Sequence, residues 1–181
     1  SNRAILAASS VAKERSDIRL LTACQTLKGV LESTQDLLLR NSFMHVDIIG
    51  SLPGADKGRE EEHLDKVMNW AIEQNKRLHV HVDQLNTPEE KETELLARKT
   101  MQHGLEGRVT AVHSISVAAH PYAYRQEVYK MSKDAGLSFI TCPSAWIDHP
   151  RREDLVPSHN AITPVEEMLE HDLIVALGSD N

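Results

Sequence analysis

The chain has 181 residues, of which 26% are charged and 40% hydrophobic, and its net charge is −7 at pH 7. This length suits one domain with a substantial core. The excess of acidic residues argues against binding to the phosphate backbone, so no nucleic acid is expected as a partner.

No apolar run reaches the roughly 20 residues that cross a bilayer, and residues 1–10 lack the pattern of a signal peptide. We therefore expect a cytoplasmic protein without a membrane partner. In such a compartment the two cysteines, Cys24 and Cys142, are expected to be free buried thiols.

Hydrophobic periodicity and turn residues predict alternating helices and strands. In chain order these are helix 3–13, strand 17–24, helix 34–40, strand 44–51, helix 60–75, strand 77–84, helix 87–103, strand 108–113, helix 122–135, strand 138–142, helix 163–171 and strand 173–178. The helix at 87–103 has a Thr87-Pro88-Glu89-Glu90 start signal and a stop at Gly104. His63, on the helix at 60–75, is expected to face solvent.

Six strands that alternate with helices predict an α/β fold, with a parallel sheet or barrel of βα units. In such folds the chemistry lies at the carboxyl ends of the strands. Six polar residues are predicted to lie at those ends: Gln25, His81, Asp83, Gln84, His113 and Asp180.

The stretch 77–84 shows this most clearly. Alternation along a strand puts His79, His81 and Asp83 on one face. One histidine at a strand end is more often a hydrogen-bonded structural residue than a ligand. However, His81, His113 and Asp180 end different strands, and imidazole and carboxylate are the usual ligands of catalytic Zn²⁺ or Fe²⁺. We therefore predict a metal site at these three residues.

From residue 17 to 181 the chain resembles the amidohydrolase superfamily, and within it the cytosine deaminase branch of metal-dependent hydrolases. The resemblance rests on four segments: His81-Val82-Asp83, Gly107 to His113, Ile162 to Glu170, and Gly178-Ser179-Asp180-Asn181. The spacing between the candidate ligands also fits this branch.

This resemblance implies a (β/α)8 TIM barrel and hydrolysis of C–N bonds in a cyclic amide or aminoheterocycle through a metal-activated water. It also implies one divalent metal ion, zinc, with iron or manganese as alternatives. His81 would be the metal ligand of the fifth strand, and His113, on the sixth, would contact the metal or the hydrolytic water. Asp180 would bind the metal and accept the proton of the attacking water. Gln25 would hydrogen-bond the small-molecule substrate, with Asn181 beside it.

Two positions depart from the pattern of cytosine deaminases. Gln84 stands where the branch has its acid–base glutamate, and Asn181 replaces a second acid. An amide cannot shuttle a proton to a ring nitrogen, so either the substrate or the activity is altered. A relative that removes alkylamines from s-triazine rings also lacks this glutamate, which favours an altered substrate as much as a lost activity.

The family's first strand carries a His-x-His pair of metal ligands, and no such strand precedes Arg3. His79 and His81 match this pair by themselves, but the strand count instead fits strands 3 to 8. We thus expect residues 1–181 to form a single hydrolase domain that lacks the first βα units. Such a barrel exposes two strand edges that invite pairing with another chain. Either further residues belong to the barrel, or the barrel closes by association as a homo-oligomer. The alternative to an enzyme is a catalytically incomplete barrel, inactive alone, that binds a ligand or a partner chain.

Overall fold

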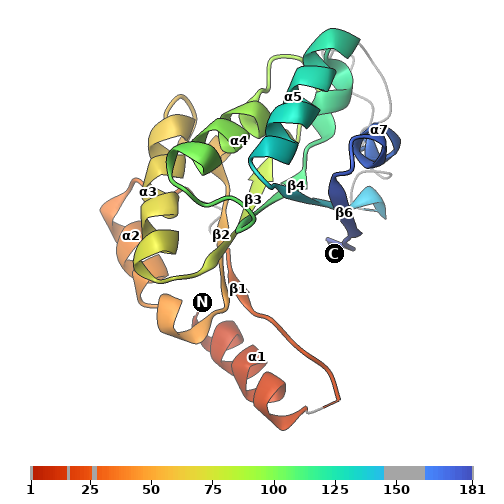
Figure 1. Cartoon of the computed structure of the whole chain (residues 1–181). Coiled ribbons are helices and arrows are strands. Elements are labelled where there is room, and N and C mark those ends of the chain that lie inside the picture. Colours follow the sequence, from red (N-terminus) through yellow and green to blue (C-terminus); the bar gives the residue numbers. More distant parts are fainter. Residues whose placement is uncertain (1, 16, 26–27, 145–161, 181) are drawn as a thin grey trace. The chain divides into compact units, whose positions relative to one another are not determined.

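The computed structural model describes residues 2–15, 17–25, 28–144 and 162–180 (Figure 1). Its strands are β1 (Ala23–Cys24), β2 (Ile48–Ser51), β3 (Arg77–Val82), β4 (Val109–His113), β5 (Ser138–Thr141) and β6 (Ile174–Leu177). Its helices are α1 (Asn2–Glu14), α2 (Ser33–Arg40), α3 (Glu60–Glu73), α4 (Glu92–Gln102), α5 (Tyr122–Asp134) and α7 (Val165–Glu170), with short 3-10 helices η1 (Phe43–His45), η2 (Pro53–Asp56) and η3 (Ile115–Ala119). The strand order follows the sequence, from β1 to β6. The predicted alternation of strands and helices is therefore confirmed.

The chain divides into two compact units, 1–79 and 80–181, and the division falls within β3. The prediction of one hydrolase domain over 1–181 stays a prediction. No helix in the described ranges is long and apolar enough to cross a membrane.

In the first unit, β1 and β2 are parallel, with Ala23 opposite Ile48 and Cys24 opposite Ile49. Helix α3 packs its apolar face inward, and Leu64, Val67 and Met68 have no exposed surface. The repeat of apolar residues three and four positions apart explains this one-sided burial.

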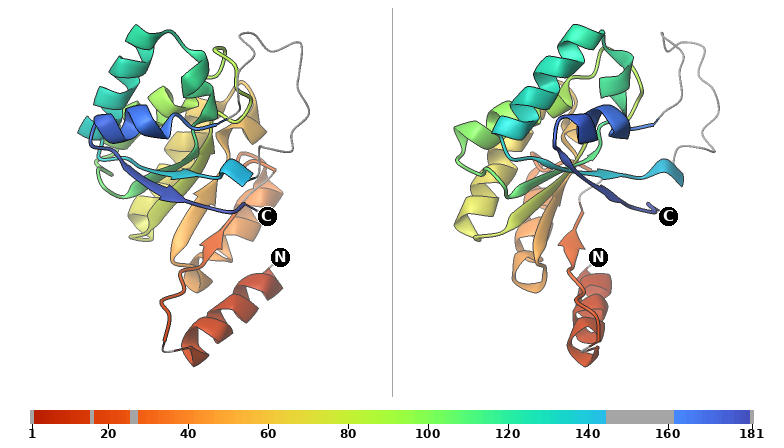
Figure 2. Two further views of the ribbon diagram at one scale, coloured as in Figure 1. Left: turned by 90° about the vertical axis from the view of Figure 1, so that its right-hand side faces the viewer. Right: turned by 45° about the vertical axis from the view of Figure 1, so that its right-hand side comes forward.

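In the second unit, β4, β5 and β6 are parallel neighbours (Figure 2). Ile140 of β5 lies opposite Val112 on one side and Ala176 on the other. Strand β6 is last in the order, and its residues Ile174 and Leu177 are 72% and 82% exposed. The predicted association with a second copy remains a prediction.

All six strands are shorter than predicted, and two of them, β1 and β2, by four residues or more. Residues 17–22 are not part of β1, and directly before the strand the backbone N–H of Thr22 donates to the Asp47 carboxylate at 2.8 Å. Ile18, Leu20 and Leu21 are exposed rather than buried. In the second case, residues 43–45 form η1, so the strand begins only at Ile48.

The helix predicted at 87–103 begins later, at Glu92. Glu90 does not complete a capping box. Instead its carboxylate accepts hydrogen bonds from the Leu85 N–H at 2.7 Å and the Ser116 hydroxyl at 2.5 Å. The predicted stop is confirmed, because Gly104 has a φ of +64°, which favours glycine.

The expected exposure of His63 is wrong. His63 has no exposed surface, and its Nε2 lies 2.7 Å from the Ser51 hydroxyl and its Nδ1 2.6 Å from the Asp56 carboxylate. Burial lowers the pKa of His63, against the effect of Asp56. Ser51 is equally buried, whereas 14% of the Asp56 side chain is exposed, so these contacts join η2 and α3 to the end of β2 with His63 and Ser51 closed to a substrate.

Candidate metal centre

The second unit brings three predicted ligands together at its strand ends. His81 lies near the end of β3, His113 ends β4 and Asp180 follows β6. The His81 and His113 rings have centroids 5.2 Å apart, and His113 Nε2 lies 3.7 Å from Asp180 Oδ2. His113 is buried, whereas Asp180 is exposed. The site therefore has a buried base and an accessible carboxylate.

His113 has the protonation state that a metal ligand needs. Burial lowers its pKa to about 4, and the nearby His81 acts in the same direction while Asp180 opposes both. The ring is therefore neutral at pH 7 and has a nitrogen lone pair. A neutral imidazole beside an accessible carboxylate is a donor set that fits a divalent ion.

The backbone around the site is held in conformations that L residues seldom adopt. The φ angles are +77° at His113, +52° at Ser114 and +49° at Asp180. The Ser114 N–H donates to the Val82 carbonyl at 3.1 Å, and the Thr163 hydroxyl donates to the His113 carbonyl. Such outliers persist only where surrounding bonds fix them, and they are frequent at functional sites.

Asp83 does not point into the site with His81. Its φ of +54° breaks the strand alternation, and its buried carboxylate accepts from the N–H groups of Glu92 at 2.7 Å and Thr93 at 3.0 Å. In return the Glu92 carboxylate accepts from the Asp83 N–H at 2.9 Å. Asp83 thus caps α4 and fixes the end of β3, two residues after His81. Burial raises its pKa, while the bonds from Thr93 and Glu92 oppose that shift.

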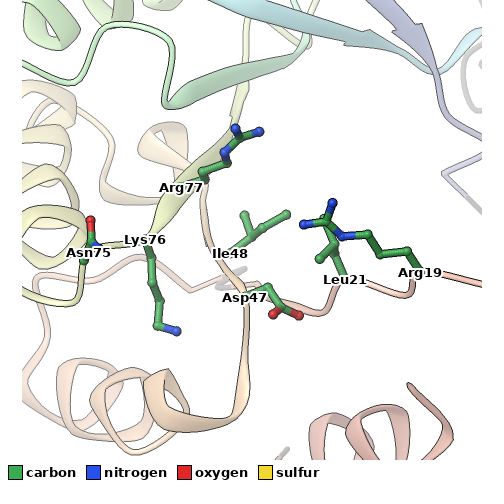
Figure 3. Close-up of a pocket in the computed structure, with 7 residues that line it drawn as sticks. All are labelled: Arg19, Leu21, Asp47, Ile48, Asn75, Lys76 and Arg77. Atoms are coloured by element: carbon green, nitrogen blue, oxygen red, sulfur yellow. The ribbon is translucent and has the colours of Figure 1, made fainter. Parts of the chain in front are cut away.

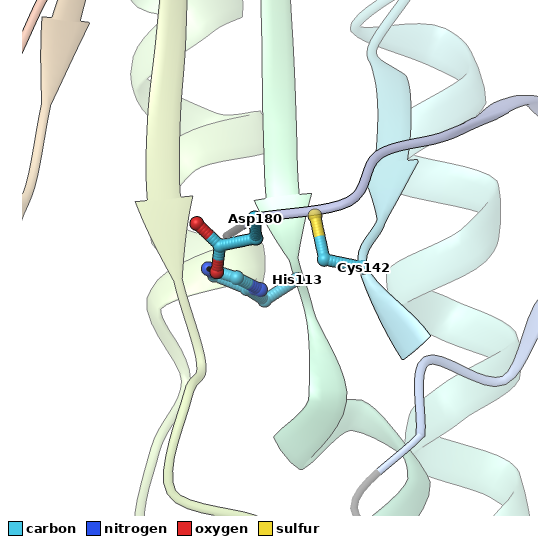
Figure 4. Close-up of side chains that lie close together, drawn as sticks. All are labelled: His113, Cys142 and Asp180. Atoms are coloured by element: carbon cyan, nitrogen blue, oxygen red, sulfur yellow. Dashed lines mark ion pairs between the residues drawn. The ribbon is translucent and has the colours of Figure 1, made fainter. Parts of the chain in front are cut away.

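Cys142 is a neighbour of the site that the sequence analysis did not identify. The predicted free, buried state of both cysteines is confirmed. Figure 4 shows the Cys142 side chain, at the end of β5, beside His113 and Asp180. One ligand atom from each of the three residues lies within 4.8 Å of the other two. Burial and the Asp180 charge raise the pKa of the thiol.

The other predicted site residues are only partly placed. Gln84 is half-buried, three positions after His81. Gln25 is exposed and directly follows β1, in the first unit. Asn181 lies outside the described residues. Their roles toward a substrate stay predictions.

The first unit has a pocket of about 420 Å³ at the amino ends of β2 and β3 (Figure 3). Its lining residues are Arg19, Leu21, Asp47, Ile48, Asn75, Lys76 and Arg77. Asp47 accepts from the Thr22 N–H, and Lys76 donates to the Val46 carbonyl at 2.5 Å. This pocket lies at the strand beginnings, whereas βα folds carry their chemistry at the strand ends.

The pH dependence of stability tests the buried state of His113. An unfolded histidine takes up a proton below about pH 6.5, whereas folded His113 does so only near pH 4. The unfolded state therefore binds more protons as the pH falls through this window, and the free energy of unfolding decreases. We expect His113 to contribute a loss of about 2 kcal/mol between pH 6.5 and pH 5, at about 1.4 kcal/mol per pH unit. Urea denaturation of the metal-free protein at both pH values measures it.

The control for that measurement is His103→Gln, which changes a half-buried histidine at the end of α4. In His113→Gln the pH-dependent loss should shrink by about 2 kcal/mol, and in His103→Gln it should persist. An identical pH dependence in the wild type and in His113→Gln would contradict a neutral buried ring.

The chain is similar to longer proteins. It is 45% identical over 172 residues to an uncharacterised protein of Haemophilus influenzae. This match covers 93% of this chain and 62% of that protein. It is 27% identical over 179 residues to the N-isopropylammelide isopropyl amidohydrolase of Pseudomonas sp. strain ADP. This match covers 98% of this chain and 41% of that enzyme. The chain thus spans less than two thirds of either relative.

A solved structure extends the similarity to the fold. The crystal structure of 5-methylcytosine deaminase from Klebsiella pneumoniae, liganded with phosphonocytosine, matches with a TM-score of 0.88 at 25% identity. The match covers 98% of this chain and 45% of that one. It confirms the predicted fold, a partial (β/α)8 barrel.

The family itself follows from a match of nearly the whole sequence. The model of the amidohydrolase family matches residues 17–181, the same range over which the motifs around His81, His113 and Asp180 carry the resemblance. The chain belongs to the amidohydrolase family.

Proposed function

We propose that the protein is a metal-dependent hydrolase of C–N bonds that acts on a cyclic amide or an aminoheterocycle. The observation that carries this proposal is the neutral His113 ring, 3.7 Å from the accessible Asp180 carboxylate and beside His81. Family membership supports the reaction class, and the names of the two enzymes reported above support the substrate class.

His81, His113 and Asp180 would hold one divalent ion, zinc, with iron or manganese as the alternatives. When bound, such an ion lowers the pKa of a water molecule toward neutrality and so supplies a hydroxide nucleophile. The donor set found here consists of nitrogen and oxygen atoms that suit all three metals.

Asp180 accepts the proton of the attacking water in this proposal. An exposed carboxylate at the strand ends is accessible to water and to solvent-borne protons. Because its ring is neutral, His113 does not act as a general acid at neutral pH, and it steadies the water or the oxyanion through a hydrogen bond from its ring N–H.

Gln84, Gln25 and Asn181 orient the substrate. An amide side chain offers both a donor and an acceptor, which suits the alternating donors and acceptors of an aminoheterocycle or a cyclic amide. Since an amide does not transfer protons, the substrate is one whose ring needs no proton from residue 84. We therefore favour an altered substrate over cytosine itself.

The test measures the release of ammonia or alkylamine by the full-length protein from cytosine, 5-methylcytosine, N-isopropylammelide and a cyclic amide. We expect hydrolysis of at least one compound, loss of this activity after treatment with a chelator, and recovery when Zn²⁺ is added back. Activity that survives complete removal of the metal would contradict the proposal, as would a metal-loaded protein that hydrolyses no C–N bond in the panel.

A further inference from the structure

Cys142 has the surroundings of a ligand rather than of a packing residue. Its side chain is 4% exposed and lies beside His113 and Asp180. The sulfur, one ring nitrogen of His113 and one carboxylate oxygen of Asp180 all lie within 4.8 Å of one another. In the described part of the chain the thiol has no hydrogen-bond partner. A buried sulfur that faces an imidazole and a carboxylate has chemical partners suited to a shared cation.

The strand ends bring the thiol to this position. The Gly178 N–H donates to the Thr141 carbonyl at 2.8 Å, which extends the pairing of β5 with β6 beyond the last strand residues. One residue after Pro143, the Ser144 hydroxyl donates to the Ser179 carbonyl at 2.9 Å. These two bonds place Cys142 beside the segment that carries Asp180.

Gly178 provides the room for the sulfur. A Cβ atom at this position would lie 2.9 Å from Cys142 Sγ and 3.0 Å from a methyl group of Ile140. With any larger residue at 178, the sulfur or the backbone of residue 178 would have to shift. The absence of a side chain at 178 therefore keeps the thiol within reach of His113 and Asp180.

The distances suit a common metal ion. Bond lengths of about 2.0–2.3 Å place the ligand atoms of a tetrahedral zinc about 3.3–3.8 Å apart. The 3.7 Å between His113 Nε2 and Asp180 Oδ2 falls in this range. Sγ lies within 4.8 Å of one ring nitrogen of His113 and of one carboxylate oxygen of Asp180, so a shift of about 1 Å brings it to bonding geometry.

We propose that the Cys142 thiolate is a further ligand of the metal ion, next to His113 and Asp180. The inference rests on the proposed function, because it concerns the same ion. When the sulfur–metal bond forms, the thiol releases its proton to solvent and no electron is transferred. A thiolate also favours zinc over manganese, since soft sulfur ligands select zinc whereas manganese prefers oxygen.

X-ray absorption spectroscopy of the zinc-loaded full-length protein tests this ligand. We expect a sulfur scatterer at about 2.3 Å from the zinc in the wild type and its loss in Cys142→Ser. The matched control is Cys24→Ser, which removes the other buried thiol of the chain, on β1, and should leave the sulfur scatterer in place.

A second measurement needs no variant and so does not depend on the folding of Cys142→Ser. The wild-type protein is alkylated with and without Zn²⁺, and each cysteine peptide is quantified by mass spectrometry. Zn²⁺ should slow the alkylation of Cys142 at least tenfold and leave that of Cys24 unchanged.

The outcomes separate this inference from the proposed function. Bound zinc with only nitrogen and oxygen scatterers, or equal alkylation of Cys142 with and without zinc, overturns Cys142 as a ligand and leaves the hydrolase proposal standing. A protein that binds no metal overturns both proposals.

Discussion

Asp180→Asn should reduce C–N bond hydrolysis by the full-length protein at least about a thousandfold. The amide keeps the size of the side chain but cannot accept the proton of the attacking water, and it is a weaker metal ligand than a carboxylate. Steady-state kinetics on the best substrate of the panel measures the effect. The loss should appear in kcat rather than in KM, since the changed group acts on the reacting water.

Asp172→Asn is the matched control. Both aspartates are exposed and both have left-handed backbone, with φ of +49° at Asp180 and +58° at Asp172. Asp172 lies before β6 and pairs with Lys133 of α5 at 2.8 Å. The kcat of Asp172→Asn should therefore stay within about twofold of the wild-type value. Equal kcat values for Asp180→Asn and the wild type would exclude Asp180 from the reaction.

Asp83→Ala should lower the free energy of unfolding by about 3 kcal/mol. The change leaves the Glu92 and Thr93 N–H groups without their acceptor at the start of α4, and it places alanine at a φ of +54°. Asp83→Asn retains one carbonyl acceptor and should lose only about 1 kcal/mol. Urea denaturation followed by circular dichroism measures both variants.

The effect of Asp83 should extend to the metal centre. Asp83 fixes the end of β3 two residues after His81, so its loss should weaken zinc binding by about 10–100-fold, the range for residues that orient a ligand. Asp134→Ala, at an exposed position of α5, should change neither stability nor zinc affinity. If Asp83→Ala matched this control in both measurements, the cap would not position His81.

The parallel α/β fold was predictable because its signals are local and repeated. Alternation in 77–82 and helical spacing in 60–73 each specify one element with one buried face. The carboxyl ends of parallel strands lie on one edge, so His81, His113 and Asp180 could be assigned to one site without coordinates. Their closeness is now observed, and their roles are proposals.

Other features depend on contacts that the sequence pattern does not contain. Asp83 itself has a left-handed backbone, and this one conformation overrides the strand alternation that predicted the face on which its side chain lies. Directly before the short β1, the Asp47 carboxylate accepts the hydrogen bond of the Thr22 N–H. The burial of His63 depends on Asp56 and Ser51, which come from elements outside its own helix.

Cys142 illustrates the same limit at the metal centre. The residue ends a strand, as the predicted ligands do, but one cysteine next to a proline has no spacing that marks a ligand. Only the register of β5 against β6 and the small Gly178 show that its sulfur lies near His113 and Asp180.

Metal analysis of the purified full-length protein tests the central claim most directly. Wild type, His81→Ala, Asp180→Ala and the control His103→Ala are compared by mass spectrometry of bound metal after dialysis. We predict about one divalent ion per chain in the wild type and in His103→Ala, and a small fraction of that in His81→Ala and Asp180→Ala. Full metal content in both His81→Ala and Asp180→Ala would contradict the assignment of this metal centre.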